Sequence, residues 1–263
     1  MPDREIKDTP ANHSETSATN PPPSLRSYTS ARVALRRTGV SLATSEILDF
    51  QLAHAQARDA VHATLDTEHL THRLRAEIPS LSSPVLTLAS AAPDRTTYLR
   101  RPDLGRTLAL ASATLLKPSS CDIVIVIADG LSATAVEHHA VPLLAALLPT
   151  LSQNQTIGPI CIATEARVAI ADQIGSLLHA RLSLILIGER PGLSSADSLG
   201  AYITWNPSPG RTDADRNCIS NIRTAGLDYA TAANRIAFYC AEAHRLQLTG
   251  TALKEITKPQ LNP

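Results

Sequence analysis

The strongest candidate for a binding site in the sequence is an almost wholly apolar run that ends abruptly in charged residues. Residues 182–187 (LSLILI) have the composition of a buried strand, and Glu189 and Arg190 follow after a glycine. A buried strand that ends in charged groups typically delivers them to a ligand crevice. A polar segment then continues to residues 215–223 (DRNCISNIR). We therefore expect this stretch, from residue 182 to 223, to form part of a binding site.

Asp129, Ser132 and His138 are the residue types of a hydrolase catalytic triad. Ser132 and His138 span nearly two turns of one expected helix, which is poor geometry for a base that must take the serine proton. The sequence also lacks GxSxG, GxGxxG and GxxxxGK[ST] motifs. A stand-alone α/β hydrolase or transferase therefore remains only an alternative, and we predict no catalytic residue.

The sequence gives only a weak indication of a metal-binding site. His69 and His72 are three residues apart and share one helix face, but no carboxylate or cysteine stands in a ligand-like register with them. Solvated helix histidines are the favoured interpretation, and no metal site is predicted. The four cysteines are far apart, and Cys161 and Cys240 have apolar neighbours typical of small core residues. Cys218 differs, because it lies in the polar segment.

Composition excludes several classes of protein. Lys plus Arg and Asp plus Glu each number 24 in 263 residues, so no net field favours nucleic acid or an anionic membrane. No apolar run reaches the roughly 18 residues of a membrane span, and no secretory signal pattern is present. We expect a cytoplasmic protein with reduced thiols. Its core should be aliphatic, because only 3% of residues are aromatic.

Three regions follow from the pattern along the chain. Residues 1–28 are rich in Pro, Ser, Thr and Asn, which predicts a flexible leader. Residues 29–118 read as a mainly helical N-terminal domain, and residues 119–263 as an α/β domain. In the helical region we expect helices over about 44–65, 68–77 and 102–117, and a short strand over 84–88. Three arginines crowd residues 98–106, where they form either a solvated face or a clamp for a carboxylate or phosphate.

Continuous apolar strands alternate with helices after residue 119. Such alternation predicts a Rossmann-like parallel sheet that helices cover on both faces. The expected strands are residues 123–127, 156–163, 182–187 and 201–205, and the expected helices follow residue 132 and cover 168–178 and 229–246. Ligands bind such sheets at the carboxyl ends of the strands. Thr134 and Glu137 fit a capping box at one helix start.

Several segments, in order from about residue 31 to the last helix, resemble the small (light) subunit of ethanolamine ammonia-lyase. They are ALRRTG at 34–39, FQLAHAQARDAVH at 50–62, YLRRPDLGR at 98–106, IADGLS at 127–132, RVAIADQIG at 167–175, IGERPGL at 187–193 and DRNCISNIR at 215–223. The final three are the most specific to that family.

The resemblance implies a subunit of an adenosylcobalamin-dependent lyase that converts ethanolamine to acetaldehyde and ammonia by a radical mechanism. In that family the large subunit carries the catalytic barrel and substrate site, and cobalamin lies between the subunits of a hetero-oligomer. Carried over to this sequence, the family's cobalamin contacts fall on Val168, Glu189 and Cys218. Asp129, Arg190 and Asn221 are secondary candidates.

Structural alternatives stay open for each of these residues. Glu189 can pair with Arg190 or Arg216 at the surface, and Val168 can be an ordinary core residue. A stand-alone nucleotide-binding or assembly module without catalysis is the alternative function. Family members that are packaged in bacterial microcompartments tend to have an amphipathic N-terminal helix, and residues 1–28 show no helical period. The cytoplasm is therefore the preferred location.

Overall fold

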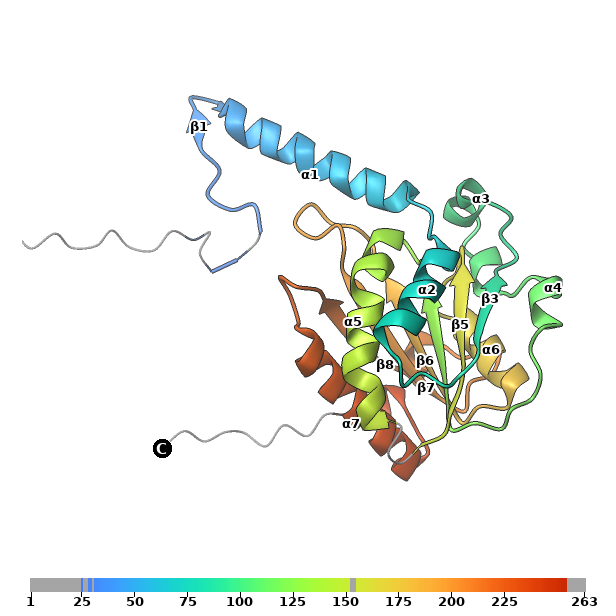
Figure 1. Ribbon diagram of the computed structural model, residues 1–263. Coiled ribbons are helices and arrows are strands. Elements are labelled where there is room, and N and C mark those ends of the chain that lie inside the picture. The colour runs from blue at the N-terminus through green and yellow to red at the C-terminus, as the bar shows by residue number, and fades with distance from the viewer. Residues whose placement is uncertain (1–24, 26–27, 30, 152–154, 255–263) are drawn as a thin grey trace, which may run out of the picture. The chain divides into compact units, whose positions relative to one another are not determined.

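The computed structural model describes residues 25, 28–29, 31–151 and 155–254 (Figure 1). The chain divides into two compact units, Met1–Glu46 and Ile47–Pro263. In the first unit β1 (Arg37–Thr38) and β2 (Ser41–Leu42) form a small antiparallel pair. The leader predicted for residues 1–28 lies almost wholly outside the described residues. Within residues 31–151 and 155–254, none of the helices combines the length and the apolar character that a membrane crossing requires.

The second unit alternates helices and strands, as its apolar periodicity predicts. Its elements in chain order are α1 (Thr44–His62, which begins in the first unit), α2 (Thr67–Glu77), β3 (Val85–Ala89), α3 (Arg95–Arg100), the 3₁₀ turn η2 (Leu104–Arg106), α4 (Leu110–Ala113), β4 (Ile123–Ala128), α5 (Ala133–Leu151), β5 (Ile157–Thr164), α6 (Ile170–Leu178), β6 (Leu182–Gly188), β7 (Leu199–Trp205), η3 (Asp213–Asp215), β8 (Arg216–Ile222), α7 (Tyr229–Leu246) and η4 (Gly250–Ala252). Most of the expected elements are therefore present within a few residues.

The fold is α/β with a mixed six-stranded sheet of order β3-β5-β4-β6-β7-β8. The first four strands are parallel, and β7 is antiparallel to both of its neighbours. The prediction of a wholly parallel sheet is wrong at this edge. A parallel connection needs a crossover of a dozen or more residues, usually a helix. The segment 189–198 between β6 and β7 is short and holds no helix, so β7 returns beside β6 in the opposite direction.

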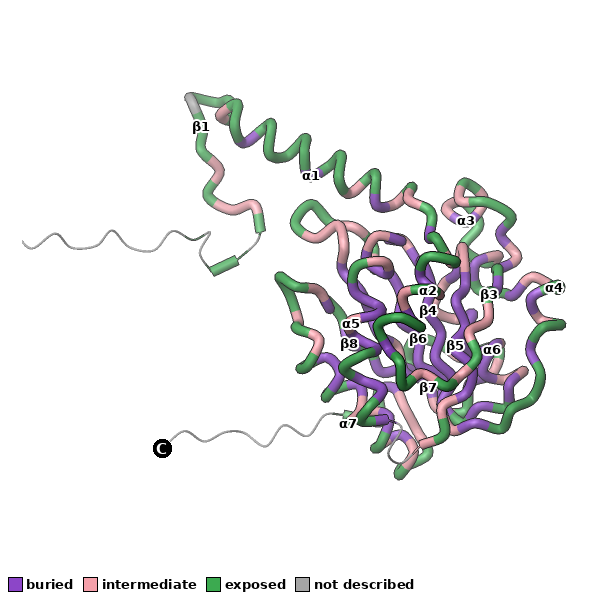
Figure 2. The backbone as a smooth tube through the Cα atoms, in the orientation of Figure 1, coloured by how far each residue is buried: buried purple, intermediate pink, exposed green. Residues whose placement is uncertain are grey.

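The central strand β4 explains why the sequence reads as uninterrupted apolar runs. Its residues alternate between two cores, and every one of them is buried. Ile123, Ile125 and Ile127 pack in one cluster with α2, α5 and α7, whereas Val124 and Val126 pack in a second cluster with α6. A strand that helices cover on both faces has no solvent-exposed face, so its side chains are apolar on both sides. Figure 2 shows the strands buried between these helices.

The sheet core draws on residues before the expected boundary at 118. Strand β3 is an edge strand of the same sheet, paired with β5. Leu70 and Leu74 of α2 are buried in the same apolar cluster as α5. The contacts within the chain divide it between Glu46 and Ile47.

The helix expected over residues 102–117 is wrong, because this segment forms only η2 and α4 after the short helix α3. A Cβ atom on Gly105 would lie 2.9 Å from atoms of both Tyr98 and Arg167, so the backbone here packs directly against these side chains. The amide of Leu108 donates to Oε1 of Gln173 at 2.8 Å. The Leu108 amide is thus satisfied by a side chain of α6 instead of by a helical carbonyl, and the segment is held against α3 and α6.

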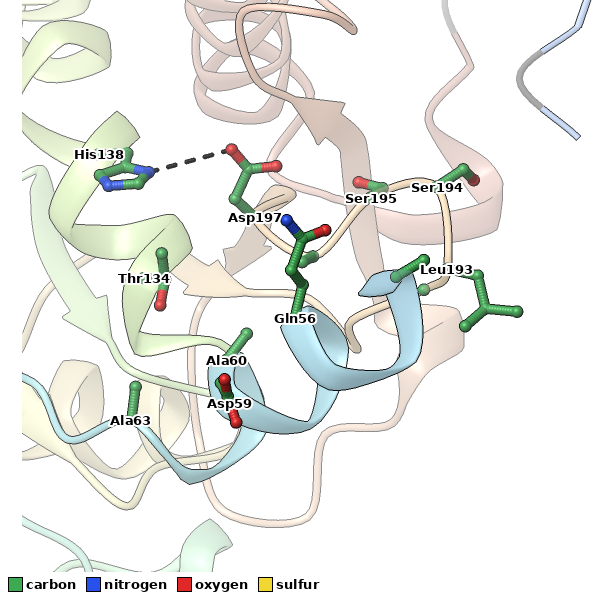
Figure 3. A pocket seen from close by; sticks show the side chains of 13 residues that line it. Gln56, Asp59, Ala60, Ala63, Thr134, His138, Leu193, Ser194, Ser195 and Asp197 are labelled. Atoms are coloured by element: carbon green, nitrogen blue, oxygen red, sulfur yellow. Dashed lines mark ion pairs between the residues drawn. The ribbon is translucent and has the colours of Figure 1, made fainter. Parts of the chain in front are cut away.

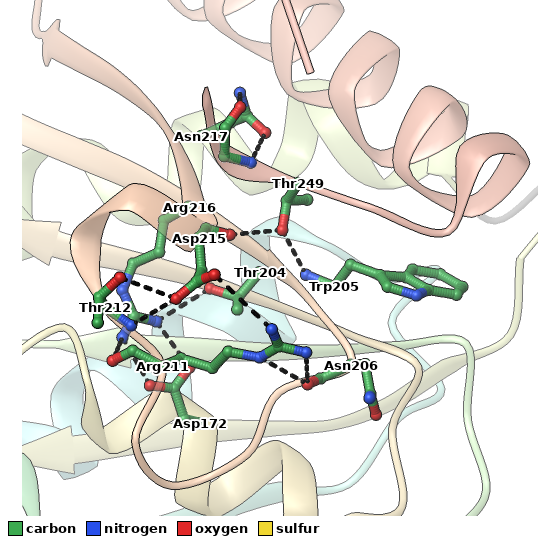
Figure 4. A network of polar contacts seen from close by, with 11 residues as sticks. Asp172, Thr204, Trp205, Asn206, Arg211, Thr212, Asp215, Arg216, Asn217 and Thr249 are labelled. Carbon is green, nitrogen blue, oxygen red and sulfur yellow. Dashed lines mark hydrogen bonds and ion pairs between the residues drawn. The ribbon is translucent and has the colours of Figure 1, made fainter. Parts of the chain in front are cut away.

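A buried ion pair fastens β8 to the rest of the sheet (Figure 4). Arg216 Nη1 and Nη2 lie 2.6 and 2.7 Å from the two carboxylate oxygens of Asp172 in α6, and both side chains are 2% exposed. The guanidinium also donates to Thr204 Oγ1 at 3.0 Å and to the carbonyl of Arg211 at 3.0 Å. Burial raises the pKa of Asp172, and the hydrogen bonds and charge of Arg216 oppose that rise. The pair joins α6, β7 and β8 at one point.

Replacing Asp172 by asparagine should lower the free energy of unfolding by about 3 to 5 kcal/mol, because it leaves a buried guanidinium without its counter-charge. Urea unfolding followed by circular dichroism measures this loss. Glu242→Gln is the matched control, since it breaks an exposed two-contact pair with Arg245 and should change stability little. Equal effects of the two substitutions would contradict the role given to the buried pair.

Candidate functional site

The carboxyl ends of β4 and β5 are joined by one buried carboxylate. Asp129, directly after β4, is 2% exposed. Its two oxygens accept hydrogen bonds from the amides of Glu165 and Ala166, after β5, at 2.8 and 3.0 Å. Nη1 of Arg95 lies 3.5 Å from Asp129 Oδ2, and it donates to Glu165 at 3.0 Å and to the carbonyl of Gly130 at 2.9 Å. Two strand ends and α3 are thereby held in one arrangement.

Burial raises the pKa of Asp129 to about 6, although the two backbone amides and Arg95 favour its charged form. Both of its oxygens are engaged inside the protein. Asp129, a secondary candidate for cofactor contact, is thus placed to organise the sheet edge rather than to face a ligand.

A cavity of about 360 Å³ opens beside this cluster. Two of the three predicted cobalamin contacts line it, Val168 and Glu189, and so does the secondary candidate Arg190. Three further side chains line the cavity, Tyr98, Arg167 and Tyr202, and no local sequence pattern marks them as site residues. The apolar β6 residue Ile187 forms part of the wall.

Val168 is half-buried in the turn that leads into α6. The helix begins at Ile170, so the expectation that Val168 starts it is wrong by two residues. The amide of the preceding Arg167 donates to the carbonyl of Gly105 at 2.7 Å, and the carbonyl of Val168 accepts from the amide of Ala171 at 3.2 Å. The side chain packs against the apolar cluster under α6. Val168 is therefore both a core neighbour and a part of the cavity wall.

Glu189 follows β6 directly and is held by three donors. The hydroxyls of Ser198 and Ser220 donate to its two carboxylate oxygens, each at 2.5 Å, and the amide of Asn221 donates at 3.3 Å. Arg216, one of the partners considered for Glu189, binds Asp172 instead. The carboxylate is thereby fixed between the segment before β7 and the end of β8.

Cys218 lies in β8, so its expected position in a polar loop is wrong. The strand alternates: Asn217 and Ile219 are buried, whereas Cys218 and Ser220 are exposed. Cys218 pairs in register with Tyr202 of β7. Tyr202 also lines the cavity. Two of the three predicted contacts, Val168 and Glu189, thus line one cavity, and Cys218 lies beside it, level with Ile185 in the middle of β6.

Tyr98 and Arg167 form a stack that sequence reasoning missed. The guanidinium carbons of Arg95 and Arg167 lie 4.8 and 4.3 Å from the centre of the buried Tyr98 ring, and its hydroxyl donates to the carbonyl of Ala166 at 3.1 Å. The arginine-rich segment around Tyr98 was a signal for anion binding, but its partner Arg167 is too distant in sequence to be recognised.

A second hollow, of about 420 Å³, shares Arg167 and Val168 with the first. Its wall includes Arg106, Arg211 and Arg216, and also Asp213. One of the three arginines in residues 98–106, Arg106, therefore lines a possible anion site. Arg101 binds Asp103 at the surface, with Nη2 and Oδ2 2.7 Å apart.

A third cavity, of about 600 Å³, lies among α1, α5 and residues 192–197 (Figure 3). None of the three predicted cobalamin contacts lines it. His138 does, and its Nδ1 is 3.9 Å from Asp197 Oδ2.

The hydrolase constellation is not assembled. The Ser132 hydroxyl donates to the carbonyl of Ala196 at 2.9 Å and accepts from the amide of Ala135 at 3.2 Å. Ser132 thus caps α5, which begins one residue later, and it takes the place expected for Thr134. Asp129 and His138 face other partners, as described above.

Known proteins of one family are similar to this chain over most of its length. Residues 19–254 match the family model of the ethanolamine ammonia-lyase light chain (EutC). The chain is 50% identical over 253 residues to the ethanolamine ammonia-lyase small subunit of Pseudomonas paraeruginosa, covering 94% of this chain and 91% of the relative. It is 52% identical over 236 residues to that of Bradyrhizobium diazoefficiens, covering 88% and 89% of the two chains.

The raised pKa of Asp129 predicts a specific pH dependence of stability. The carboxyl group binds its proton more tightly in the folded than in the unfolded chain, so its contribution is complete below about pH 4 and is lost as pH rises through about 6. Relative to Asp129→Asn, the wild-type free energy of unfolding should fall by roughly 3 kcal/mol between pH 4 and 7. Urea unfolding at each pH measures this difference.

Asp228→Asn is the control of opposite sign. Hydrogen bonds from Thr231 lower the pKa of Asp228, so wild type should gain stability relative to this variant as pH rises through the acid range. Curves with the same slope for the two variants would contradict the environment described for Asp129.

Proposed function

The chain belongs to the ethanolamine ammonia-lyase light-chain family, and on that basis we propose that it holds one side of adenosylcobalamin in an ethanolamine ammonia-lyase. The reaction converts ethanolamine to acetaldehyde and ammonia. The observation that carries the proposal is that Val168 and Glu189 line one cavity at the carboxyl ends of the parallel strands, with Cys218 next to the cavity residue Tyr202. When bound, adenosylcobalamin supplies radical chemistry through its cobalt–carbon bond, and the protein supplies binding, orientation and exclusion of water.

The side chains around the smaller cavity fit such a cofactor. A corrin has apolar faces and a rim of amide groups, and the wall combines Ile187 and Val168 with the polar Glu189 and Arg190. A carboxylate has about four acceptor sites. Ser198, Ser220 and Asn221 use three of them on Glu189, which leaves one for an amide N–H or a ribose hydroxyl. Arginine donors suit the amide oxygens.

The fold supports the same location. Strands β3, β5, β4 and β6 are parallel, and α5 and α6, which follow β4 and β5, pack in different cores. We describe this parallel part of the sheet as Rossmann-like. Ligands of such folds bind outside the carboxyl ends of the strands, where successive connections go to opposite faces. The cluster of Asp129, Gly130 and Glu165 lies at that point.

The adjoining basic hollow suits the phosphate of the cofactor's nucleotide. Four arginines contribute to its wall, and the buried Nε of Arg167 has no hydrogen-bond partner among the described residues. Because the two hollows share Arg167 and Val168, one extended ligand can reach both. The same chemistry favours a nucleotide as the ligand of the alternative, a stand-alone binding or assembly module.

The size of the cavity implies a partner. A volume of about 360 Å³ is near the lower limit for pockets that hold drug-sized molecules, and cobalamin is larger than these. We propose that the large subunit covers the rest of the cofactor and supplies the catalytic residues and the ethanolamine site, in a hetero-oligomer located in the cytoplasm. A bacterial microcompartment is the alternative location.

Co-expression with the large-subunit gene tests the proposed function. The two chains should co-purify, and the complex should convert ethanolamine to acetaldehyde only when adenosylcobalamin is added, whereas this chain alone should show no turnover. Turnover without the cofactor would favour the stand-alone enzyme. Failure to co-purify, together with nucleotide binding by this chain alone, would favour the binding module.

Glu189→Ala should weaken cobalamin binding by the assembled complex about tenfold or more, because a charge-assisted hydrogen bond is lost. Titration with cyanocobalamin, followed by its absorbance, measures the affinity. Glu242→Ala removes a carboxylate on α7 that lies outside both hollows, and this matched control should bind as wild type does. Unchanged cobalamin affinity in Glu189→Ala would remove Glu189 from the site, provided that the complex remains assembled.

A further inference from the structure

Two histidines and one aspartate meet on the opposite side of the 189–198 segment from Glu189. His138 and His139 belong to α5, and Asp197 lies just before β7. One ligand atom from each lies within 4.8 Å of the others, and this is the one group of three metal-binding side chains found among the residues that the structure describes. His69 and His72, the pair considered from sequence, are exposed on α2 and are not part of such a group.

We propose that His138, His139 and Asp197 form a binding site for a divalent transition metal of the zinc type. Zinc binds histidine nitrogen and carboxylate oxygen at about 2.0 to 2.2 Å in tetrahedral geometry, which separates neighbouring ligand atoms by about 3.3 Å. His139 Nε2 is 3.3 Å from Asp197 Oδ2. His138 Nδ1 is 3.9 Å from the same oxygen, a difference that a small rotation of the exposed imidazole removes.

The environment of His139 is that of a positioned metal ligand. The residue is 3% exposed, and its Nδ1 is 2.9 Å from the hydroxyl of Tyr229 at the start of α7. Histidine ligands usually donate the N–H of their second nitrogen to such a group, which fixes the tautomer and the ring orientation. When Nδ1–H donates to Tyr229, the lone pair of Nε2 is available to bind a metal ion beside Asp197.

Asp197 is held from both sides along the chain. The carbonyl of Ala196 accepts the hydroxyl of Ser132 at 2.9 Å, and the hydroxyl of Ser198 donates to Glu189 at 2.5 Å. The carboxylate between them is therefore placed by neighbouring hydrogen bonds that do not use its own oxygens. Such pre-organisation lowers the cost of assembling a metal site.

His138 leaves one side of the site accessible. Its side chain is 58% exposed and lines the cavity of about 600 Å³, where Figure 3 shows it directed toward Asp197. Three protein ligands beside a cavity leave a fourth position for water or an exchangeable ligand. A bound metal would fasten the 189–198 segment to α5. Because Ser198, the residue after Asp197, donates a hydrogen bond to Glu189, the metal would also stabilise the position of Glu189.

The test is metal binding by the full-length chain after chelator treatment, and it does not depend on cobalamin. In competition with a chromogenic chelator, wild type should bind one equivalent of zinc. His138→Ala and Asp197→Asn should each bind it at least tenfold more weakly, as expected when a ligand is removed. Both side chains are partly exposed, so the variants should fold, which circular dichroism confirms.

His72→Ala is the matched control, because it removes an exposed helix histidine outside the site and should bind zinc as wild type does. Cobalt(II) provides a second measurement: a four-coordinate site gives visible absorption bands that should be present in wild type and His72→Ala and absent in the two ligand variants. The proposal is overturned if wild type binds no stoichiometric zinc, or if His138→Ala and Asp197→Asn bind it as tightly as wild type.

Discussion

The carboxylate of Asp129 is the constraint on which the arrangement of the sheet edge depends. By accepting the amides of Glu165 and Ala166 it joins the ends of β4 and β5. The next residue, Gly130, has a φ of 57°, and a Cβ there would lie 2.2 Å from the carbonyl oxygen of Gly188. Only glycine permits this approach and conformation together. The ends of three strands are thereby brought within reach of a single ligand.

The antiparallel part of the sheet completes this edge. Strand β8 reads as a polar loop in the sequence because one of its faces is exposed at the margin of the sheet. Its buried anchor, Arg216, compensates the burial of Asp172 in α6, and its exposed Ser220 binds Glu189. A central strand is buried on both faces and excludes such polar residues, whereas the edge strand β8 can carry them on its exposed face. They supply the rim of the proposed cofactor site.

The 189–198 segment has a different chemistry at each end. Glu189 faces the cavity that we propose for the cofactor, and Asp197 faces the two histidines of α5. The ends are connected through Ser198, whose hydroxyl binds Glu189 and whose carbonyl accepts the Glu189 amide at 2.9 Å. The two ends of the segment are therefore joined by direct hydrogen bonds.

The sequence by itself determined the α/β class, nearly all of the strands of the parallel core and the helices α1, α2, α5, α6 and α7, because apolar periodicity and β-branched runs are local properties of the chain. The family resemblance also selected Val168, Glu189 and Cys218 before their placement was known. Only the tertiary structure decided the direction of β7, the existence of β8 and the broken path of residues 95–113. The ion pair of Arg216 with Asp172 and the hydrogen bond of Ser220 with Glu189 each join residues that are far apart in the sequence. Such pairings depend on strand order and register, which no local pattern encodes.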